Sequence, residues 1–362
     1  GWESAFQAGA ILSADGLNGT FYVISGFTDQ TDFMTWAQLH TLAGEGNEIG
    51  GHTIDHTELT TLSPVEQERE ICNDRENLIN EGFQPTSFAY PDGAFDPGTE
   101  AIAQQCGYNS ARTVGGVLKY NGTYCPQNPS GSVQPPSPCV TAETVPPLDP
   151  YATRTAGTIE STDTPAQIEQ LVTQAQNNGG GWVQLIFHQI CNGDCPGEAD
   201  PVDDDATPAT LTTVANWLKG QEANNTVVET VNQVIGGSVQ PGVPGPAAPP
   251  AETGPQILQN GNLANTTGTN VPDCFQVGGY GTNTANYSWS PVGSSGSGSE
   301  TAAVSGYSNG VAGIVTTQDQ GTCSPSINPG QSYTVGMTYT STAPSYLQVW
   351  YRNTFGAWLY WT

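Results

Sequence analysis

Two histidines four residues apart are the residues of this sequence best suited to metal chemistry. His52 and His56 flank Thr53-Ile54-Asp55 and follow Gly50-Gly51, where glycine permits a sharp turn. In a helical turn this spacing points both imidazoles to the same side, within reach of one metal ion. A purely structural role for both rings is the competing interpretation, because the pattern also occurs in proteins that bind no metal.

Two further segments carry groups suited to acyl chemistry. Tyr90-Pro91-Asp92-Gly93 follows a strand-like run. Pro91 lacks an N–H and Gly93 permits unusual backbone angles, so the amide of Asp92 is free to face a developing oxyanion. His188 ends the most apolar run of the first half and is a candidate proton donor. A plain turn and a polar strand end are the alternative interpretations.

Alternating strand-like and helix-like segments are expected to position these groups. The strand-like runs cover residues 19–24, 48–51, 86–90 and 182–187. Helices are expected over 34–43, which contains His40 as a structural residue, and after the N-terminal caps Ser63, Asp96, Thr164 and Thr207, each followed by Pro. Glu66 and Gln167 stand at capping-box positions. This alternation favours a parallel α/β sheet or barrel, whose functional groups gather at the carboxyl ends of the strands.

The chain divides at a segment rich in Pro and Gly. Residues 236–256 predict an extended linker, because their composition does not support a packed core. Beyond it, strand candidates such as 332–339 and 346–351 alternate with Asn, Gly and Ser turns. The domains are therefore predicted as an α/β domain over 1–235 and an all-β sandwich or jelly-roll module over 257–362.

The composition excludes several classes of partner. The chain has 362 residues, only seven Lys and Arg, and a formal net charge of -27. Such an acidic chain repels nucleic acid and anionic membrane surfaces. It has no apolar run of the ~20 residues that a membrane span requires. A neutral or cationic polymer is the better partner, and we expect the protein to be a monomer.

The eight cysteines favour an oxidising compartment. Local pairs predict disulfides for Cys125 with Cys139, Cys191 with Cys195 and Cys274 with Cys323, and Cys72 and Cys106 are expected on neighbouring helices. A zinc site at Cys191 and Cys195 is the less favoured alternative, since no second Cys or His pair follows. Together with the abundance of Gly, Ser, Thr and Asn, these pairs indicate a secreted protein.

Residues 1 to about 235 resemble the NodB-homology polysaccharide deacetylases, carbohydrate esterase family 4. The matching segments are Gly19-Thr20-Phe21-Tyr22-Val23, His52-Thr53-Ile54-Asp55-His56, Phe88-Ala89-Tyr90-Pro91-Asp92-Gly93 and Leu185-Ile186-Phe187-His188. The resemblance implies a distorted (β/α) barrel, one divalent metal that is usually Zn²⁺, and hydrolysis of N-acetyl or sometimes O-acetyl groups on sugars.

The resemblance also implies a role for each candidate residue. His52 and His56 are the implied metal ligands, and the amide of Asp92 is the implied oxyanion donor, within the segment that begins at Tyr90. His188 is the implied general acid. Leu185, Ile186 or Phe187 would form the wall for the acetate methyl group.

Three departures from the family pattern are expected to affect activity. The family's paired aspartates, a metal ligand and the general base, would stand just before Gly1, and the sequence does not include them. Ala89 occupies the position where many members have Arg, which makes Arg112 the candidate cation, with a structural ion pair as the alternative. The usual Asp-x-x-Asp-Trp motif is not evident. We therefore expect a fragment at both ends, nearly inactive as it stands.

Three function hypotheses remain from the sequence. An N-deacetylase of a chitin-like, peptidoglycan or exopolysaccharide substrate is preferred. An acetylxylan-type O-deacetylase and a non-catalytic carbohydrate-binding protein are the alternatives. In the second domain, six aromatic residues are candidates either for stacking on sugars or for filling the sandwich core: Tyr280, Tyr287, Trp289, Trp350, Tyr351 and Trp358.

Overall fold

The computed structural model describes residues 1–118, 139–193, 195, 205–247, 257–268, 270–293, 297–318 and 323–361. The chain forms two units: residues 1–245 together with 350–361 make the first, and residues 246–349 make the second. In chain order, the second unit is therefore inserted between two parts of the first.

A five-stranded parallel sheet is the framework of the first unit, with strand order β1-β2-β3-β4-β5. The strands are β1 (Thr20–Val23), β2 (Glu48–Gly51), β3 (Ser87–Ala89), β4 (Ser110–Gly116) and β5 (Thr153–Thr155). This sheet confirms the parallel α/β fold expected from the sequence. Among the described residues the sheet is open, with β1 at one edge, and its closure into a barrel remains a prediction.

The apolar run at 182–187 does not form the continuous strand that was expected. It makes only isolated bridges, from Trp182 to Glu143 and from Ile186 to Thr158. The next strands are β6 (Gln189–Ile190) and β7 (Asp205–Ala206), which pair with each other in parallel. The 182–187 run is apolar and partly buried, but a strand also needs hydrogen-bond partners along its backbone, and bridges are found at only two positions of this run.

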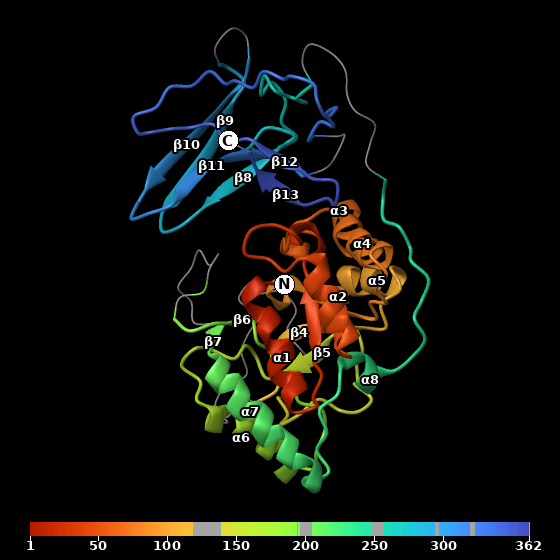
Figure 1. Cartoon of the computed structure of the whole chain (residues 1–362). Coiled ribbons are helices and arrows are strands. Elements are labelled where there is room, and N and C mark those ends of the chain that lie inside the picture. The colour runs from red at the N-terminus through yellow and green to blue at the C-terminus, as the bar shows by residue number, and fades with distance from the viewer. Residues whose placement is uncertain are drawn as a thin grey trace. The chain divides into compact units, whose positions relative to one another are not determined.

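Helices pack around the sheet. They are α1 (Phe6–Ala14), α2 (Trp36–Gly44), α3 (Pro64–Glu68), α4 (Asp74–Asn80), α5 (Pro97–Gln105), α6 (Pro165–Asn177), α7 (Pro208–Gly220) and α8 (Val231–Ile235). Of these, α3, α5, α6 and α7 begin at the predicted caps. A π-helical turn, 69–73, joins α3 to α4. The helices α6 and α7 lie side by side, and α1 packs on α7 (Figure 1).

The observed caps agree with the sequence at five of the six predicted positions. Ser63, Asp96 and Thr207 each accept a hydrogen bond from an amide in the first turn of the following helix. Thr164 and Gln167 form the predicted capping box. The exception is Glu66, whose carboxylate forms ion pairs with Arg69 and Arg352. A charged partner outcompetes a backbone amide for a buried carboxylate.

Three of the predicted disulfides are present. Cys72 is bonded to Cys106, Cys191 to Cys195, and Cys274 to Cys323. The first joins the π-helical turn to the end of α5, so it ties two neighbouring helices together as expected. The predicted partner of Cys139, Cys125, lies outside the described residues.

Short antiparallel sheets make up the second unit. β8 (Phe275–Tyr280) pairs with β11 (Val311–Thr316), and β9 (Thr284–Ser290) pairs with β10 (Ser299–Ser305). A strand was expected over 332–339, but that segment is irregular and exposed. The prediction for 332–339 rested on the alternation of strand-like and turn-like residues. Such a segment also needs a partner strand before it can form a hydrogen-bonded sheet. The sandwich therefore remains a prediction.

The predicted domain limits of 1–235, 236–256 and 257–362 remain predictions, although the structure adds two contacts that bear on them. The start of the Pro/Gly-rich segment is held on the first unit, where Arg75 donates hydrogen bonds to the carbonyls of Gln240 and Pro241. The last strands, β12 (Trp350–Arg352) and β13 (Trp358–Tyr360), form an antiparallel pair that belongs to the first unit. Within the described residues, no helix combines the length and apolar character that crossing a membrane requires.

Candidate active site and metal centre

A loop, not a helical turn, brings the two imidazoles together. β2 ends at Gly51, and the following backbone takes left-handed conformations at Thr53 (φ 65°) and His56 (φ 61°). The ring centroids of His52 and His56 are 4.7 Å apart, with an interplanar angle of 85°. The sequence expectation of helical geometry was wrong, but the two rings meet as predicted.

A buried carboxylate fixes the start of this loop. Asp74 Oδ2 accepts a hydrogen bond from the amide of His52 (3.1 Å) and from the hydroxyl of Tyr108 (3.1 Å), and its Oδ1 accepts one from the amide of Ser25 (3.3 Å). Burial raises the pKa of Asp74 to about 8, against the opposing effect of these donors. A Cβ on Gly51 would lie 1.9 Å from Tyr108 Oη, so glycine is required at the end of β2.

A second buried carboxylate fixes the middle of the loop. Glu70 Oε2 accepts hydrogen bonds from the amides of Ile54 (3.0 Å) and Asp55 (3.2 Å). The amide of His56 donates to Thr53 Oγ1 at 2.9 Å. Because left-handed backbone is unfavourable for residues other than glycine, these contacts are needed to keep the loop in place.

The two imidazoles fit a divalent metal such as zinc. His52 Nδ1 lies 2.7 Å from the carbonyl oxygen of Ala89, which assigns the proton to Nδ1 and leaves the Nε2 lone pair available. Burial, followed by the charges of His56 and Arg112, holds the pKa of His52 well below its usual range. Burial also lowers the pKa of His56, against the opposing carboxylate of Asp92. Both rings are therefore neutral at pH 7, as metal ligation requires.

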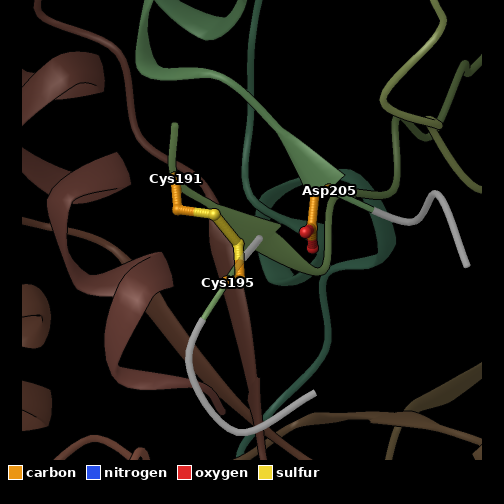
Figure 2. A group of neighbouring side chains, drawn as sticks. All are labelled: Cys191, Cys195 and Asp205. Atoms are coloured by element: carbon orange, nitrogen blue, oxygen red, sulfur yellow. A yellow bond between two sulfur atoms is a disulfide. The ribbon is translucent and has the colours of Figure 1, made fainter. Parts of the chain in front are cut away.

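The described residues do not complete a metal site around this pair. No group of three His, Cys, Asp or Glu ligand atoms within 4.8 Å of one another includes His52 and His56 in the described part of the chain. The group that does meet this criterion is Cys191, Cys195 and Asp205, shown in Figure 2. Its two sulfurs are bonded to each other, so neither is a thiolate, and the zinc alternative for these cysteines is wrong in this state.

Arg112 occupies the place beside Ala89 on the neighbouring strand. The two residues are register partners in the β3–β4 pair. The Arg112 side chain is buried with its guanidinium carbon 4.9 Å from the centre of the Tyr22 ring, and burial lowers its pKa. No salt bridge to Arg112 is found among the described residues. A buried cation without a carboxylate is costly, so this position favours an anionic partner.

One cavity brings these groups together. It has a volume of about 730 Å³ and lies between β1 and the 182–188 segment. His52, Arg112 and His188 all line it, as does Tyr22. The apolar wall expected for a methyl group is also here, in Leu185, Ile186 and Phe187. Three segments far apart in sequence therefore contribute polar side chains to one cavity.

The other two candidate site residues, Asp92 and Tyr90, are not among the residues that line this cavity. Asp92 is exposed in a 3₁₀ turn with φ 55°, and its charge acts on the pKa of His56. As the second residue of that turn, its amide has no partner within the turn. Tyr90 instead packs in the core against Phe88 and Phe95, and its hydroxyl donates to the carbonyl of Tyr151 at 3.0 Å. The structure does not bring the Tyr90 side chain to the cavity.

Three residues around this site were missed from the sequence. Glu70 and Asp74 stand four residues apart and support the same loop from one side of the helical segment, a spacing that a search for paired acids would have found. Tyr22 could be suspected only from its place on β1. The sequence does not show that each of these polar groups is buried, and burial is what makes them important.

His188 is neutral at pH 7 in this state. Burial, and then the charges of Arg112 and His56, lower its pKa to about 4. Its Nδ1 is buried without a hydrogen-bond partner in the described residues. A negative charge beside Arg112 would offset that cation and raise the pKa of His188, which would favour the protonated ring.

The lowered pKa of His188 makes a testable contribution to stability. Between pH 6.5 and about 4 the unfolded state holds a proton on His188 that the folded state does not, so stability falls as the pH falls through this window. We expect His188→Asn to reduce the slope of unfolding free energy against pH by at most ~1.4 kcal/mol per pH unit. Urea titrations of metal-free protein across that window measure it. Identical slopes for both proteins would contradict the assignment.

Part of the chain that forms this site matches a known protein family. Residues 2–111 match the family profile described as Polysaccharide deacetylase. The N-terminal part of this chain is therefore similar to polysaccharide deacetylase domains. The matched range contains β1 to the start of β4, and thus His52, His56 and Asp92. Arg112 and His188 lie beyond it.

Individual relatives of the deacetylase domain are distant. YxkH of Bacillus subtilis (strain 168) is named as a polysaccharide deacetylase. It is 29% identical over 128 residues, which are 34% of this chain and 46% of that protein. A gellan lyase of Bacillus sp. is 41% identical over 78 residues, which are 21% of this chain and 3% of that protein. The chain thus spans less than half the length of either relative.

Solved structures with some similarity to the chain have low TM-scores. A deacetylase of Streptococcus pyogenes, PplD, has 23% identity and a TM-score of 0.30, covering 31% of this chain and 51% of its own. A family 4 carbohydrate esterase from Streptomyces lividans has 13% identity and a TM-score of 0.37, covering 63% and 85%.

Proposed function

We propose that this protein is a metal-dependent deacetylase that removes N-acetyl groups from a polysaccharide. The observation that carries the proposal is the convergence of His52, Arg112 and His188 on one cavity, with His56 beside His52. Two neutral imidazoles, a buried unpaired cation and a third histidine suit the hydrolysis of an uncharged amide.

His52 and His56 would hold the metal, most simply Zn²⁺. When bound, such an ion polarises a carbonyl and lowers the pKa of water toward ~7. The chain's own contribution is orientation. The carbonyl of Ala89 fixes the His52 ring through Nδ1, and Asp74 and Glu70 fix the backbone on either side of Thr53. Hydrogen bonds that orient the ligands in this way raise the affinity of a metal site.

The other candidates would act on the acetyl group and its leaving amine. The free amide of Asp92 would donate a hydrogen bond to the developing oxyanion. His188, once protonated, would give its proton to the departing sugar amine. Arg112 would orient and neutralise the carboxylate that serves as general base. Leu185, Ile186 and Phe187 would exclude water around the acetyl methyl group.

The general base and the third metal ligand are proposed to be the aspartate pair that the family resemblance places before Gly1. Gly1 lines the same cavity as His52 and Arg112, and its amine acts on the pKa of both His52 and His56. Residues joined to that amine would enter the site directly. They would also supply the anion that Arg112 lacks among the described residues.

Secretion and sugar binding complete the proposal. Three disulfides favour an oxidising compartment. Tyr280, Trp350 and Tyr351 are exposed and suited to stack on sugar rings, whereas Tyr287, Trp289 and Trp358 are half-buried. The polysaccharide substrate is the proposed binding partner of the protein.

Acetate release tests the function. With Zn²⁺ and acetylated chito-oligosaccharides, we expect the 362-residue chain to release little acetate. The same chain preceded by Asp-Asp should be faster by about 10²–10⁴-fold, the usual contribution of a general base. His52→Gln in the longer chain is the control for metal-dependent turnover.

Three results would change the assignment. Robust release by the 362-residue chain would overturn the proposed role of the aspartates. Release from acetylxylan but not from N-acetylated oligosaccharides would favour the O-deacetylase. Saturable oligosaccharide binding by both chains without any release would favour a non-catalytic carbohydrate-binding protein.

A further inference from the structure

The last strand pair of the chain packs against the loop that carries His52 and His56. β12 and β13 pair in antiparallel register, with Arg352 opposite Trp358. The guanidinium carbon of Arg352 lies 5.3 Å from the centre of the Trp358 ring, which holds the side chain over the first unit. We call residues 350–361 the C-terminal hairpin. It belongs to the first unit although more than a hundred residues separate it from Gly245.

Arg352 forms a buried ion pair with two carboxylates. Its Nη1 lies 3.1 Å from Glu66 Oε2, and its Nη2 lies 2.9 Å from Glu70 Oε1. The side chain of Arg352 is 8% exposed, and those of Glu66 and Glu70 are 2% and 0% exposed. Removing one partner from such a buried cluster leaves an uncompensated charge, so Arg352 is needed to keep both carboxylates in place.

Glu70 uses its two oxygens for different purposes. Oε1 accepts from Arg352, while Oε2 accepts from the amides of Ile54 and Asp55, between the two histidines. A single carboxylate thus joins the C-terminal hairpin to the centre of the loop. Rotation of Glu70 after loss of Arg352 would release both amides together.

The turn of the hairpin contacts the same region from a second direction. Asn353 Nδ2 donates to the carbonyl of Gly26 at 3.0 Å, and the amide of Gly26 donates to the carbonyl of Ile54 at 2.9 Å. A Cβ on Gly26 would lie 2.4 Å from the Cβ of Ala357, and one on Gly356 would lie 3.0 Å from Ile54 Cδ1. The hairpin therefore packs directly on Ile54, which is 2% exposed.

We propose that the C-terminal hairpin positions the His52–His56 loop, with Arg352 as the positioning residue that acts through Glu70. The functional consequence, tighter metal binding, rests on the proposed deacetylase site. The positional consequence does not, because it concerns the order of the loop in metal-free protein. In the order of the sequence, the second unit would then be followed by a segment that the first unit needs.

Hydrogen–deuterium exchange of the full chain tests the positional role. In metal-free Arg352→Ala, we expect the amides of residues 52–56 to exchange at least ~10-fold faster than in the wild type, because the hydrogen bonds to a charged acceptor are weakened. Arg352→Lys keeps the charge but not the two-pronged geometry, so it should show a smaller increase in the same peptide. This conservative variant also decides the question if Arg352→Ala does not fold.

The matched control is Lys219→Ala, which removes a cation from an exposed pair with Glu222. It should leave exchange at 52–56 unchanged. Zn²⁺ titration of chains that carry Asp-Asp before Gly1 provides the second readout, in which Arg352→Ala is expected to raise the dissociation constant by about 10–100-fold, as loss of a contact that orients a metal ligand does.

The outcomes separate the two proposals. Unchanged exchange at 52–56 in both Arg352 variants, or a uniform increase over the whole first unit, would overturn the positioning role. Faster exchange at 52–56, in a chain that binds no Zn²⁺ even when Asp-Asp precedes Gly1, would support the positioning role and overturn the metal site. Faster exchange with weaker Zn²⁺ binding supports both.

Discussion

Replacing His188 with alanine, in a chain that carries Asp-Asp before Gly1, is expected to lower kcat by about 10²–10⁴-fold without loss of bound Zn²⁺. His188 shares the cavity with His52, but it is separate from the loop that holds the two proposed ligands. Its removal should therefore slow proton delivery to the leaving amine and leave the metal affinity intact. Acetate-release kinetics and metal analysis of the purified protein measure the two quantities independently.

The control is His40→Ala. His40 is exposed on α2 and stacks on Phe83 at 4.5 Å, away from the groups that line the cavity. Its replacement should change neither kcat nor zinc content. Loss of zinc from His188→Ala would make His188 a ligand, and an unchanged kcat would remove it from the reaction.

Removing the buried partner of Arg154 is expected to have the largest effect on stability. Glu143 and Arg154 are 2% and 4% exposed, and Arg154 Nε donates to Glu143 Oε2 at 2.8 Å. Burial alone would raise the pKa of Glu143, but the hydrogen bonds from Arg154 outweigh burial and lower it. We expect Glu143→Ala to reduce the free energy of unfolding by ~3–5 kcal/mol, because an uncompensated buried cation remains.

Urea unfolding at pH 7 measures this loss, and Glu222→Ala is the matched control. Glu222 pairs with Lys219 in solvent, where both side chains are about half exposed, so its removal should cost only ~0–1 kcal/mol. A loss below ~1 kcal/mol in Glu143→Ala would show that the Arg154 pair adds little to stability. The pair matters for the site because it joins β5 to the bridge partner of Trp182, next to the cavity wall.

Local chemistry made several features predictable. The caps at Asp96 and Thr164 are decided by contacts within one helical turn, so a short stretch of sequence contains the whole interaction. The strand before His52 was equally predictable, because Glu48–Gly51 is short, partly apolar and ends in glycine. The disulfide pairs at 191/195 and 274/323 followed from spacing and an even cysteine count.

Two of the predictions that failed concern the site, and their outcome depends on distant partners. The 182–187 run is apolar enough for a strand, but it bridges at only two positions. The spacing of His52 and His56 suits a helix, yet Glu70 holds the intervening amides in a loop with left-handed residues. In both cases intrinsic preference was outweighed by hydrogen-bond partners that the local sequence does not contain.

By itself, the sequence determined the parallel α/β class, the pair His52 and His56, and the family resemblance, since all of these depend on residue type and short spacing. The tertiary structure alone decided which groups share a cavity and which distant residues hold them there. Arg112 stands beside Ala89 because of strand register, and Arg352 reaches Glu70 from 282 positions along the chain. Contacts of that separation depend on how whole elements pack, and no local pattern of residues encodes them.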